Sequence, residues 1–167
     1  MEADVFMSIG RVFTEEQEIF VSAVEDYLRA NGLNPRALGR TDFSSQQPLK
    51  FIEEVMRECN GTVVIAFERF FIDSAIEFRN GEAERNLFNI KVPSVWNQIE
   101  AGMAYVLNHP LLVIMEKGLR NDGILEFGYD WYVQTIDLDP KILEGKEFIG
   151  VFKDWKKRMQ KKKNQTL

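Results

Sequence analysis

The chain has 167 residues, of which 45% are hydrophobic and 28% are charged, a balance that fits one folded domain over residues 1–167 and excludes a disordered chain. The net charge of −5 argues against a nucleic-acid partner, because phosphate contacts need a concentrated basic surface. One cysteine and one histidine exclude an internal disulfide and a Cys- or His-rich metal site, so no metal is expected. The histidine, His109, precedes a proline in a turn-like sequence and is expected in a solvated loop.

Two features of the sequence bear on its location. No apolar run approaches the roughly 20 residues that cross a bilayer, so no membrane contact is expected. The first residues, Met1-Glu2-Ala3-Asp4, are acidic where a signal peptide would be basic. We therefore expect a cytoplasmic protein.

The chain opens with a strand and a helix. Residues 5–9 form a short apolar run that ends at Gly10, typical of a buried strand. Thr14, with Gln17 three residues later, forms a capping box for a helix whose apolar residues recur at helical spacing up to Asn31-Gly32. This pattern is the start of a βαβ unit.

The next elements repeat that order. A weak strand is expected near 35–38, and Pro48 suits the first turn of a second helix that ends before Asn60-Gly61. Residues 62–67 are uniformly apolar, as a central parallel strand must be.

The stretch 68–91 is too long for an ordinary connection between elements. We expect it to contain a short helix or to form a lid over a ligand cleft.

The remaining chain adds a helix over 95–107, a strand over 111–115, an edge strand over 133–138 and a closing helix over 147–161. Alternating strands and helices predict an α/β fold with right-handed crossovers. The expected architecture is a flavodoxin-like three-layer sandwich, a mostly parallel five-stranded sheet with helices on both faces.

In such a sheet, ligands bind outside the carboxyl ends of the strands, which nominates the loops that follow them. The polar or conformationally free residues of these loops are Ser8, Gly10, Arg11 and Phe13 after the first strand, Arg40, Asp42 and Ser44 after the second, and Glu68 and Arg69 after the third. The sequence contains neither the G-x-G-x-x-G fingerprint nor a Walker lysine motif.

Glu100 is the strongest single candidate. A helical wheel places it on an apolar face whose other members are Trp96, Ile99, Met103, Val106 and Leu107. An ionised carboxylate on a core-facing stripe is costly unless it is paired or opens to a cleft, and desolvation would raise its pKa toward the range useful for catalysis. The alternatives are a structural ion pair with a buried arginine, or a side chain that bends out to solvent.

Two families share motifs with this sequence. Asp4-Val5-Phe6-Met7-Ser8 resembles the first-strand box of TIR domains, and Trp96 to Glu100 resembles the W-x-x-x-E segment of TIR domains that cleave NAD. Ser8 to Glu16 is similar to the opening loop of nucleoside 2-deoxyribosyltransferases, and Glu100 to Ala104 is similar to their E-x-G-x-A segment. The resemblance runs from about residue 4 to 115.

Both resemblances imply a nucleotide substrate whose N-glycosidic bond is cleaved, with Glu100 as the catalytic residue acting at the ribose. They imply no cofactor, with NAD as a substrate, and a homo-oligomer that completes the site. The residues then expected to bind substrate are Ser8, Gly10, Arg11, Phe13, Asp42, Ser44, Trp96 and Asn97.

Three functions follow from these patterns. The first is a TIR-like enzyme that releases nicotinamide from NAD by hydrolysis or by cyclic ADP-ribose-type synthesis, as in prokaryotic antiviral defence. The second is a nucleoside or nucleotide 2-deoxyribosyltransferase or N-glycosidase, although Asn60 and Asn97 stand where a deoxyribosyltransferase is expected to carry acidic residues. The third is a non-catalytic nucleotide-sensing or self-associating module.

Overall fold

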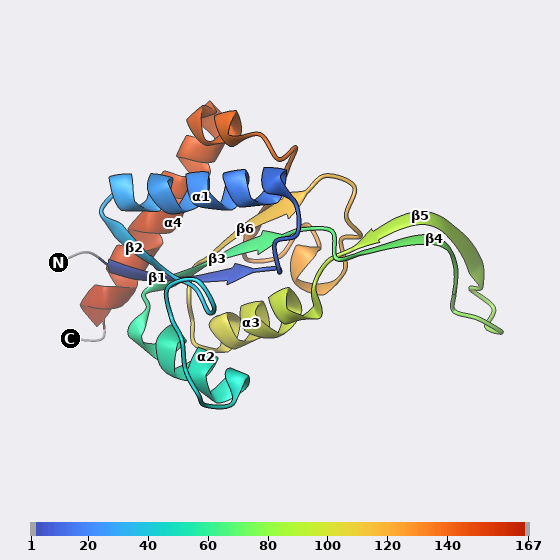
Figure 1. The fold of residues 1–167 in the computed structure, drawn as a ribbon, viewed down its shortest axis with the longest axis horizontal. Helices are drawn as coiled ribbons and strands as arrows, with labels where there is room; N and C mark the ends of the chain where they lie inside the picture. Colours follow the sequence, from blue (N-terminus) through green and yellow to red (C-terminus); the bar gives the residue numbers. More distant parts are fainter. Residues whose placement is uncertain (1–2, 166–167) are drawn as a thin grey trace.

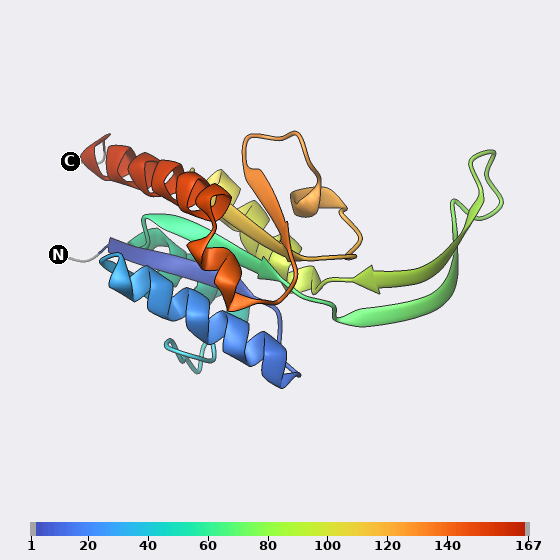
Figure 2. The ribbon, with the colours of Figure 1, turned by 90° about the horizontal axis from the view of Figure 1, so that it is seen from above.

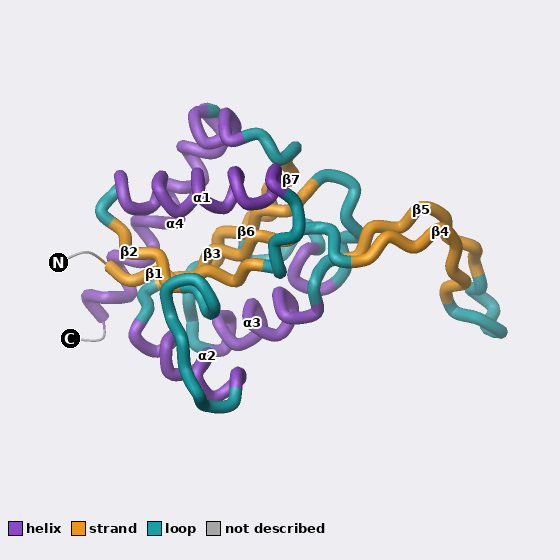
Figure 3. Tube along the Cα trace, viewed as in Figure 1, coloured by secondary structure: helices purple, strands orange, loops and turns teal. Residues whose placement is uncertain are grey.

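The computed structural model describes residues 3–165, with side chains up to Gln160, and contains a five-stranded parallel sheet (Figures 1 and 3). The strand order is β2-β1-β3-β6-β7. The strands are β1 (Ala3–Ile9), β2 (Leu33–Arg36), β3 (Gly61–Ala66), β6 (Leu111–Glu116) and β7 (Tyr132–Ile136). The central strand β3 is buried along its whole length, which explains why residues 62–67 carry no polar alternation.

Helices α1 (Glu15–Ala30) and α4 (Lys146–Gln165) cover one face of the sheet (Figure 2). Thr14 begins α1 as predicted: its hydroxyl oxygen accepts from the Gln17 backbone N–H at 3.2 Å, and the Gln17 side chain accepts from the Phe13 N–H at 3.1 Å. On α4, Phe148, Phe152 and Trp155 pack into the core. A short 3-10 helix, η2 (Pro140–Glu144), leads into α4.

Helices α2 (Pro48–Glu58) and α3 (Val95–Val106) cover the other face, together with the 3-10 turn η1 (Gly123–Leu125). Their buried side chains pack against Phe6, Val64 and Val113, the residues of the sheet that point to this side. The three-layer α/β architecture predicted from the sequence is therefore confirmed. Within the part of the chain that the structure describes, no helix combines the length and the apolarity needed to span a bilayer.

The expectation of a short helix within 68–91 is wrong. This segment forms an antiparallel hairpin, β4 (Phe70–Glu77) and β5 (Arg85–Val92), which leaves the sheet after β3 and projects away from the body (Figures 1 and 2). We call this hairpin the arm. Phe70, Ile72 and Ile76 are spaced by two and four residues and so share one face of β4, which is the period of a strand and not of a helix.

The expectation for His109 is also wrong. The ring is buried, and its Nδ1 lies 2.9 Å from the hydroxyl of Thr62 on β3. The turn-like sequence is present, but it packs against the amino-terminal end of the sheet instead of facing solvent.

Candidate functional site

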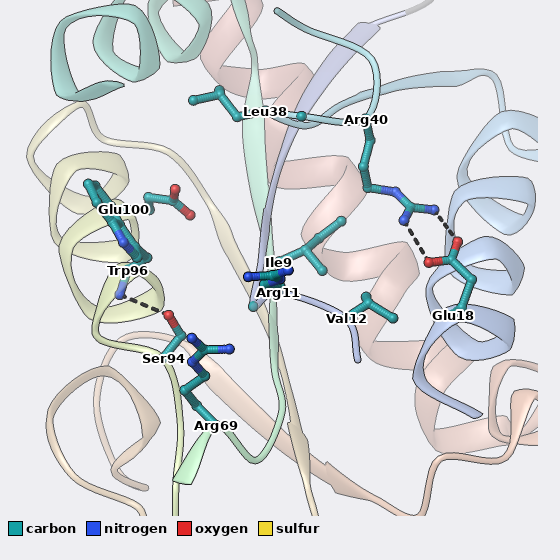
Figure 4. Close-up of a pocket in the computed structure, with 12 residues that line it drawn as sticks. Ile9, Arg11, Val12, Glu18, Leu38, Arg40, Arg69, Ser94, Trp96 and Glu100 are labelled. Atoms are coloured by element: carbon teal, nitrogen blue, oxygen red, sulfur yellow. Dashed lines mark hydrogen bonds and ion pairs between the residues drawn. The ribbon is translucent and has the colours of Figure 1, made fainter. Parts of the chain in front are cut away.

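A pocket of about 550 Å³ opens at the carboxyl ends of β1, β2 and β3, a volume that suits a drug-sized or nucleotide-sized ligand (Figure 4). Its wall combines the loop after β1, the loop after β2, the base of the arm and the first turns of α3. The residues that line it are Ile9, Gly10, Arg11, Val12, Glu18, Leu38, Gly39, Arg40, Arg69, Ser94, Trp96 and Glu100.

Glu100 is the only acidic group on the α3 side of this pocket among the described lining residues, and it is 8% exposed. Its carboxylate points from α3 toward the centre of the pocket (Figure 4). Burial raises the pKa of this carboxyl to about 7, although a hydrogen bond from the Ser8 hydroxyl lowers it in part. No cation stabilises it within the described part of the chain. A buried carboxyl with a raised pKa at the base of an open pocket is a candidate for a functional group.

The helical wheel correctly placed Glu100 on the buried side of the helix, but it assigned the wrong residues to that side. The buried face of α3 consists of Asn97, Glu100, Ala101 and Ala104, at spacings of three, one and three residues. Trp96, Ile99 and Val106, which were expected to face the core, are exposed. The small alanines let α3 approach β3 closely, so hydrophobicity alone did not indicate which side packs.

A hydrogen-bond network holds the floor of the pocket. The Asn97 side-chain NH₂ donates to Ser8 Oγ at 3.0 Å and approaches the backbone oxygens of Ser8 and Ile65, each at 3.3 Å. Ser8 in turn contacts Glu100. These bonds join α3 to the ends of β1 and β3 and so fix the carboxylate relative to the sheet.

The Asn97 Oδ1 atom is buried and has no hydrogen-bond donor among the described residues. It lies beside Gly10, where an added Cβ would be 3.5 Å from it. A buried acceptor without a partner is unusual, and here it borders a residue of the pocket wall.

Three arginines surround the pocket, and they differ in their partners. Arg40 is neutralised by Glu18 at 2.7 Å and by Glu25 at 2.8 Å. Arg11 and Arg69 have no carboxylate partner within the described residues, and the Arg69 guanidinium reaches the pocket beside Ser94 (Figure 4). Two guanidiniums without carboxylates are suited to bind an anion such as a phosphate.

The structure brings together most, but not all, of the residues predicted for the site. Gly10, Arg11, Trp96 and Glu100 line the pocket, and Ser8 and Asn97 lie directly beneath it. Trp96 is half-exposed and forms one wall.

Three predicted residues lie outside the pocket lining. Phe13 is exposed before α1. Asp42 accepts a hydrogen bond from Arg36 Nε at 3.0 Å, and Ser44 accepts from the Gln46 N–H in its own loop. The loop after β2 folds back on itself between Leu38 and Asp42, so its later residues do not reach the carboxyl ends of the strands.

Other lining residues were not among the predicted binding residues. Ser94 caps α3, where its hydroxyl accepts from the Trp96 N–H at 3.3 Å. The sequence indicated this cap, because a serine directly before an apolar helical segment is typical of an N-cap. Arg69 follows the strongest strand of the sequence, so its position was visible, but its role as a pocket residue depends on how the arm leaves the sheet.

No protein-family model matches the sequence, and no curated protein matches it. Among solved structures, the chain is similar to a CMP N-glycosidase of Clostridium botulinum, with a TM-score of 0.50 and 13% identity over 83% of this chain and 92% of that one. It is also similar to a 2-deoxyribosyltransferase of Bacillus psychrosaccharolyticus, with a TM-score of 0.47 and 17% identity over 89% and 96% of the two chains.

The likeness to the CMP N-glycosidase is one of fold alone. At such identities the likeness does not identify a substrate, and the chemistry of this chain has to be argued from its own pocket.

Proposed function

We propose that this protein is an enzyme that cleaves the N-glycosidic bond of a nucleotide, with Glu100 as its catalytic residue. The observation that carries the proposal is the unpaired Glu100 carboxylate, buried at the base of a pocket whose mouth holds Arg11 and Arg69. A carboxylate suits the positive charge that develops on the sugar, and guanidiniums suit the phosphate of the same molecule.

The reaction follows from these groups. As the bond between C1′ and the base nitrogen breaks, its electron pair leaves with the base, and positive charge develops at C1′. The ionised Glu100 stabilises that charge or bonds to C1′ in a covalent intermediate. Water then adds its hydroxyl to C1′; where the covalent intermediate has formed, the bond from C1′ to Glu100 breaks and the carboxylate is restored, and the proton of the water ends on the departed base or in solvent. If a second base attacks in place of water, the result is transfer instead of hydrolysis.

The fold similarity favours a nucleoside 5′-monophosphate as the substrate, and the CMP N-glycosidase named above acts on such a compound. A specific observation favours NAD as a second candidate. Trp96 lines the same pocket as Glu100, in the W-x-x-x-E spacing typical of NAD-cleaving TIR domains. With NAD, the departing base would be nicotinamide.

One assay separates these candidates. Purified protein is incubated with nucleoside monophosphates, the matching nucleosides and deoxynucleosides, or NAD, and the released base is measured by chromatography. We expect base release from at least one nucleotide and a loss of at least about 10²-fold in rate with Glu100→Gln. The matched control is Glu54→Gln, an exposed residue of α2, which should retain full activity.

A pH profile and two arginine variants refine the result. Because ionised Glu100 is required, kcat/KM should rise with pH up to a plateau above about 7. Arg11→Ala and Arg69→Ala should each raise KM about 10-fold or more for a nucleotide but not for its nucleoside. Absence of base release from every compound would favour the non-catalytic nucleotide-binding module instead. Full activity of Glu100→Gln would remove Glu100 from the mechanism.

A further inference from the structure

One face of the arm exposes several large apolar side chains, with the polar Ser74 and Asn86 among them. The register pairs Ile72 with Ile90 and Ser74 with Phe88, so Phe70, Ile72, Ile76 and Phe88 project from the same side of the ribbon. These four side chains are between 36% and 67% exposed, although they are among the largest apolar residues of the chain. A two-stranded ribbon is marginally stable on its own in water, and an exposed apolar face of this kind is typical of a surface that binds another surface.

The base of the arm is fixed to the body. The Arg69 N–H donates to the Val92 oxygen at 2.8 Å, and the Arg120 N–H donates to the Lys91 oxygen at 2.8 Å. The Lys91 ammonium lies 3.0 Å from Glu68. These contacts set the direction in which the arm leaves the molecule, and Figures 1 and 2 show that it points away from every helix of its own chain.

The apolar face of the arm is hollowed. A cavity of about 650 Å³ lies against the outer half of the ribbon, and most of its lining side chains belong to that face. They are Ser74, Ala75, Ile76, Arg79, Asn86 and Phe88. The cavity makes this surface concave, so it fits a convex partner.

The same chain carries a convex apolar surface on α3. Val95, Ile99, Met103 and Val106 fall within one narrow stripe of the helix, and Val95, Ile99 and Val106 are 65%, 41% and 79% exposed. We call this stripe the α3 ridge. Beside it lies an apolar groove of about 350 Å³ between α2 and α3, lined in part by Met103 and Leu107. Gly102 leaves open space there, because an added Cβ would meet nothing within 4 Å.

We propose that the arm binds the α3 ridge of a second copy of this chain, and that two copies exchange arms about a twofold axis. The fixed base keeps the arm from its own ridge, so the two complementary surfaces can meet only between molecules. The arm is long enough to cover the ridge: eight strand residues span about 26 Å and twelve helical residues span about 18 Å. A reciprocal exchange satisfies both surfaces of both copies and closes the assembly.

The area is sufficient for a stable dimer. An aromatic side chain buries on the order of 150–250 Å², and isoleucine and valine bury less, so complete burial of the exposed parts of four arm residues and three ridge residues supplies at most about 700 Å² per chain. Two chains then bury at most about 1,400 Å², within the range of about 1,200–2,000 Å² that specific interfaces show.

The first test is the oligomeric state of the full chain by sedimentation velocity. We expect a dimer at micromolar concentration that becomes a monomer with Ile76→Asp on the arm or with Val106→Asp on the ridge. Ile19→Asp, at an equally exposed apolar position of α1, should remain dimeric. Unchanged circular dichroism shows that each variant is folded.

The second test is disulfide cross-linking between singly substituted proteins. The native thiol, Cys59, is buried, and burial raises its pKa to about 12, so it does not compete. An equimolar mixture of Phe88→Cys and Val106→Cys proteins should give a covalent dimer, whereas each variant alone should give none. A monomer at all accessible concentrations overturns the proposal, and so does cross-linking of Phe88→Cys to itself, which would indicate arm-to-arm contact.

Discussion

A surface helix normally packs its apolar side on the core and turns its polar side to solvent. In α3 the two sides are reversed. The side packed on the sheet carries Asn97, Glu100 and two alanines, and the side toward solvent carries Val95, Ile99 and Val106. A helix that packs through alanines brings its backbone close to the sheet, and a polar side chain there can reach the carboxyl ends of the strands. The larger apolar residues are then left outside. The comparison teaches that a polar residue on the packed side of a helix marks a site more reliably than the hydrophobic stripe beside it.

The largest effect expected from this comparison is the dependence of stability on pH. The unfolded chain releases the Glu100 proton near pH 4.5, whereas burial raises the folded-state pKa to about 7. Between these values the folded state binds more protons, so the free energy of unfolding contributed by this group falls as pH rises and is level above pH 7. The total change is about 3 kcal/mol.

Urea denaturation of wild type and Glu100→Gln at several pH values measures this effect. The variant should gain stability relative to wild type between pH 4.5 and 7, since glutamine does not titrate. A difference that is independent of pH would mean that the carboxylate is solvated in the folded state.

The next effect tests the close approach of the packed side. Ala104 is fully buried between α3 and the sheet. Ala104→Leu should lower the free energy of unfolding by about 2 kcal/mol, because the added atoms force the helix away from β3. Val106→Leu, two residues later on the solvent side, is the matched control and should change it by less than about 0.5 kcal/mol. Equal effects would show that the two sides are packed alike.

The smallest effect concerns the exposed side. At concentrations where the protein is monomeric, Ile99→Ala should change the free energy of unfolding by less than about 0.5 kcal/mol, because its side chain is half-exposed and covers little of the core. At concentrations that favour the dimer, the same variant should lower the melting temperature more. Calorimetry at two protein concentrations separates these contributions, and a large loss in the monomer would place Ile99 in the core.

The sequence predicted the sheet and its helices well, because buried parallel strands such as 62–67 are uniformly apolar and helix ends such as Thr14 carry their own capping groups. It also predicted that Glu100 is buried. It did not predict the arm, although Phe70, Ile72 and Ile76 fall at even spacing and Asn80-Gly81 is a turn signal. The reason is that the arm has no core of its own. Its strands are exposed and carry many polar residues, so their composition resembles that of a long loop.

The predicted site residues that directly follow a strand do line the pocket. Those that lie further along a loop do not. Gly10 and Arg11 follow β1 and line the pocket. Asp42 lies several residues beyond β2, where its ion pair with Arg36 decides its position. Such pairs are tertiary contacts, and local sequence does not encode them.

The base of the arm has a consequence for the evolution and engineering of this fold. Phe70 pairs with Val92, so the two strands of the arm meet at its base, between the end of β3 and the start of α3. The chain thus departs and returns at a single point, and the hairpin could be shortened or replaced by a tight turn without disturbing any strand of the body. The same point carries Arg69, so grafting a different hairpin onto this scaffold would alter the rim of the pocket while leaving its floor intact.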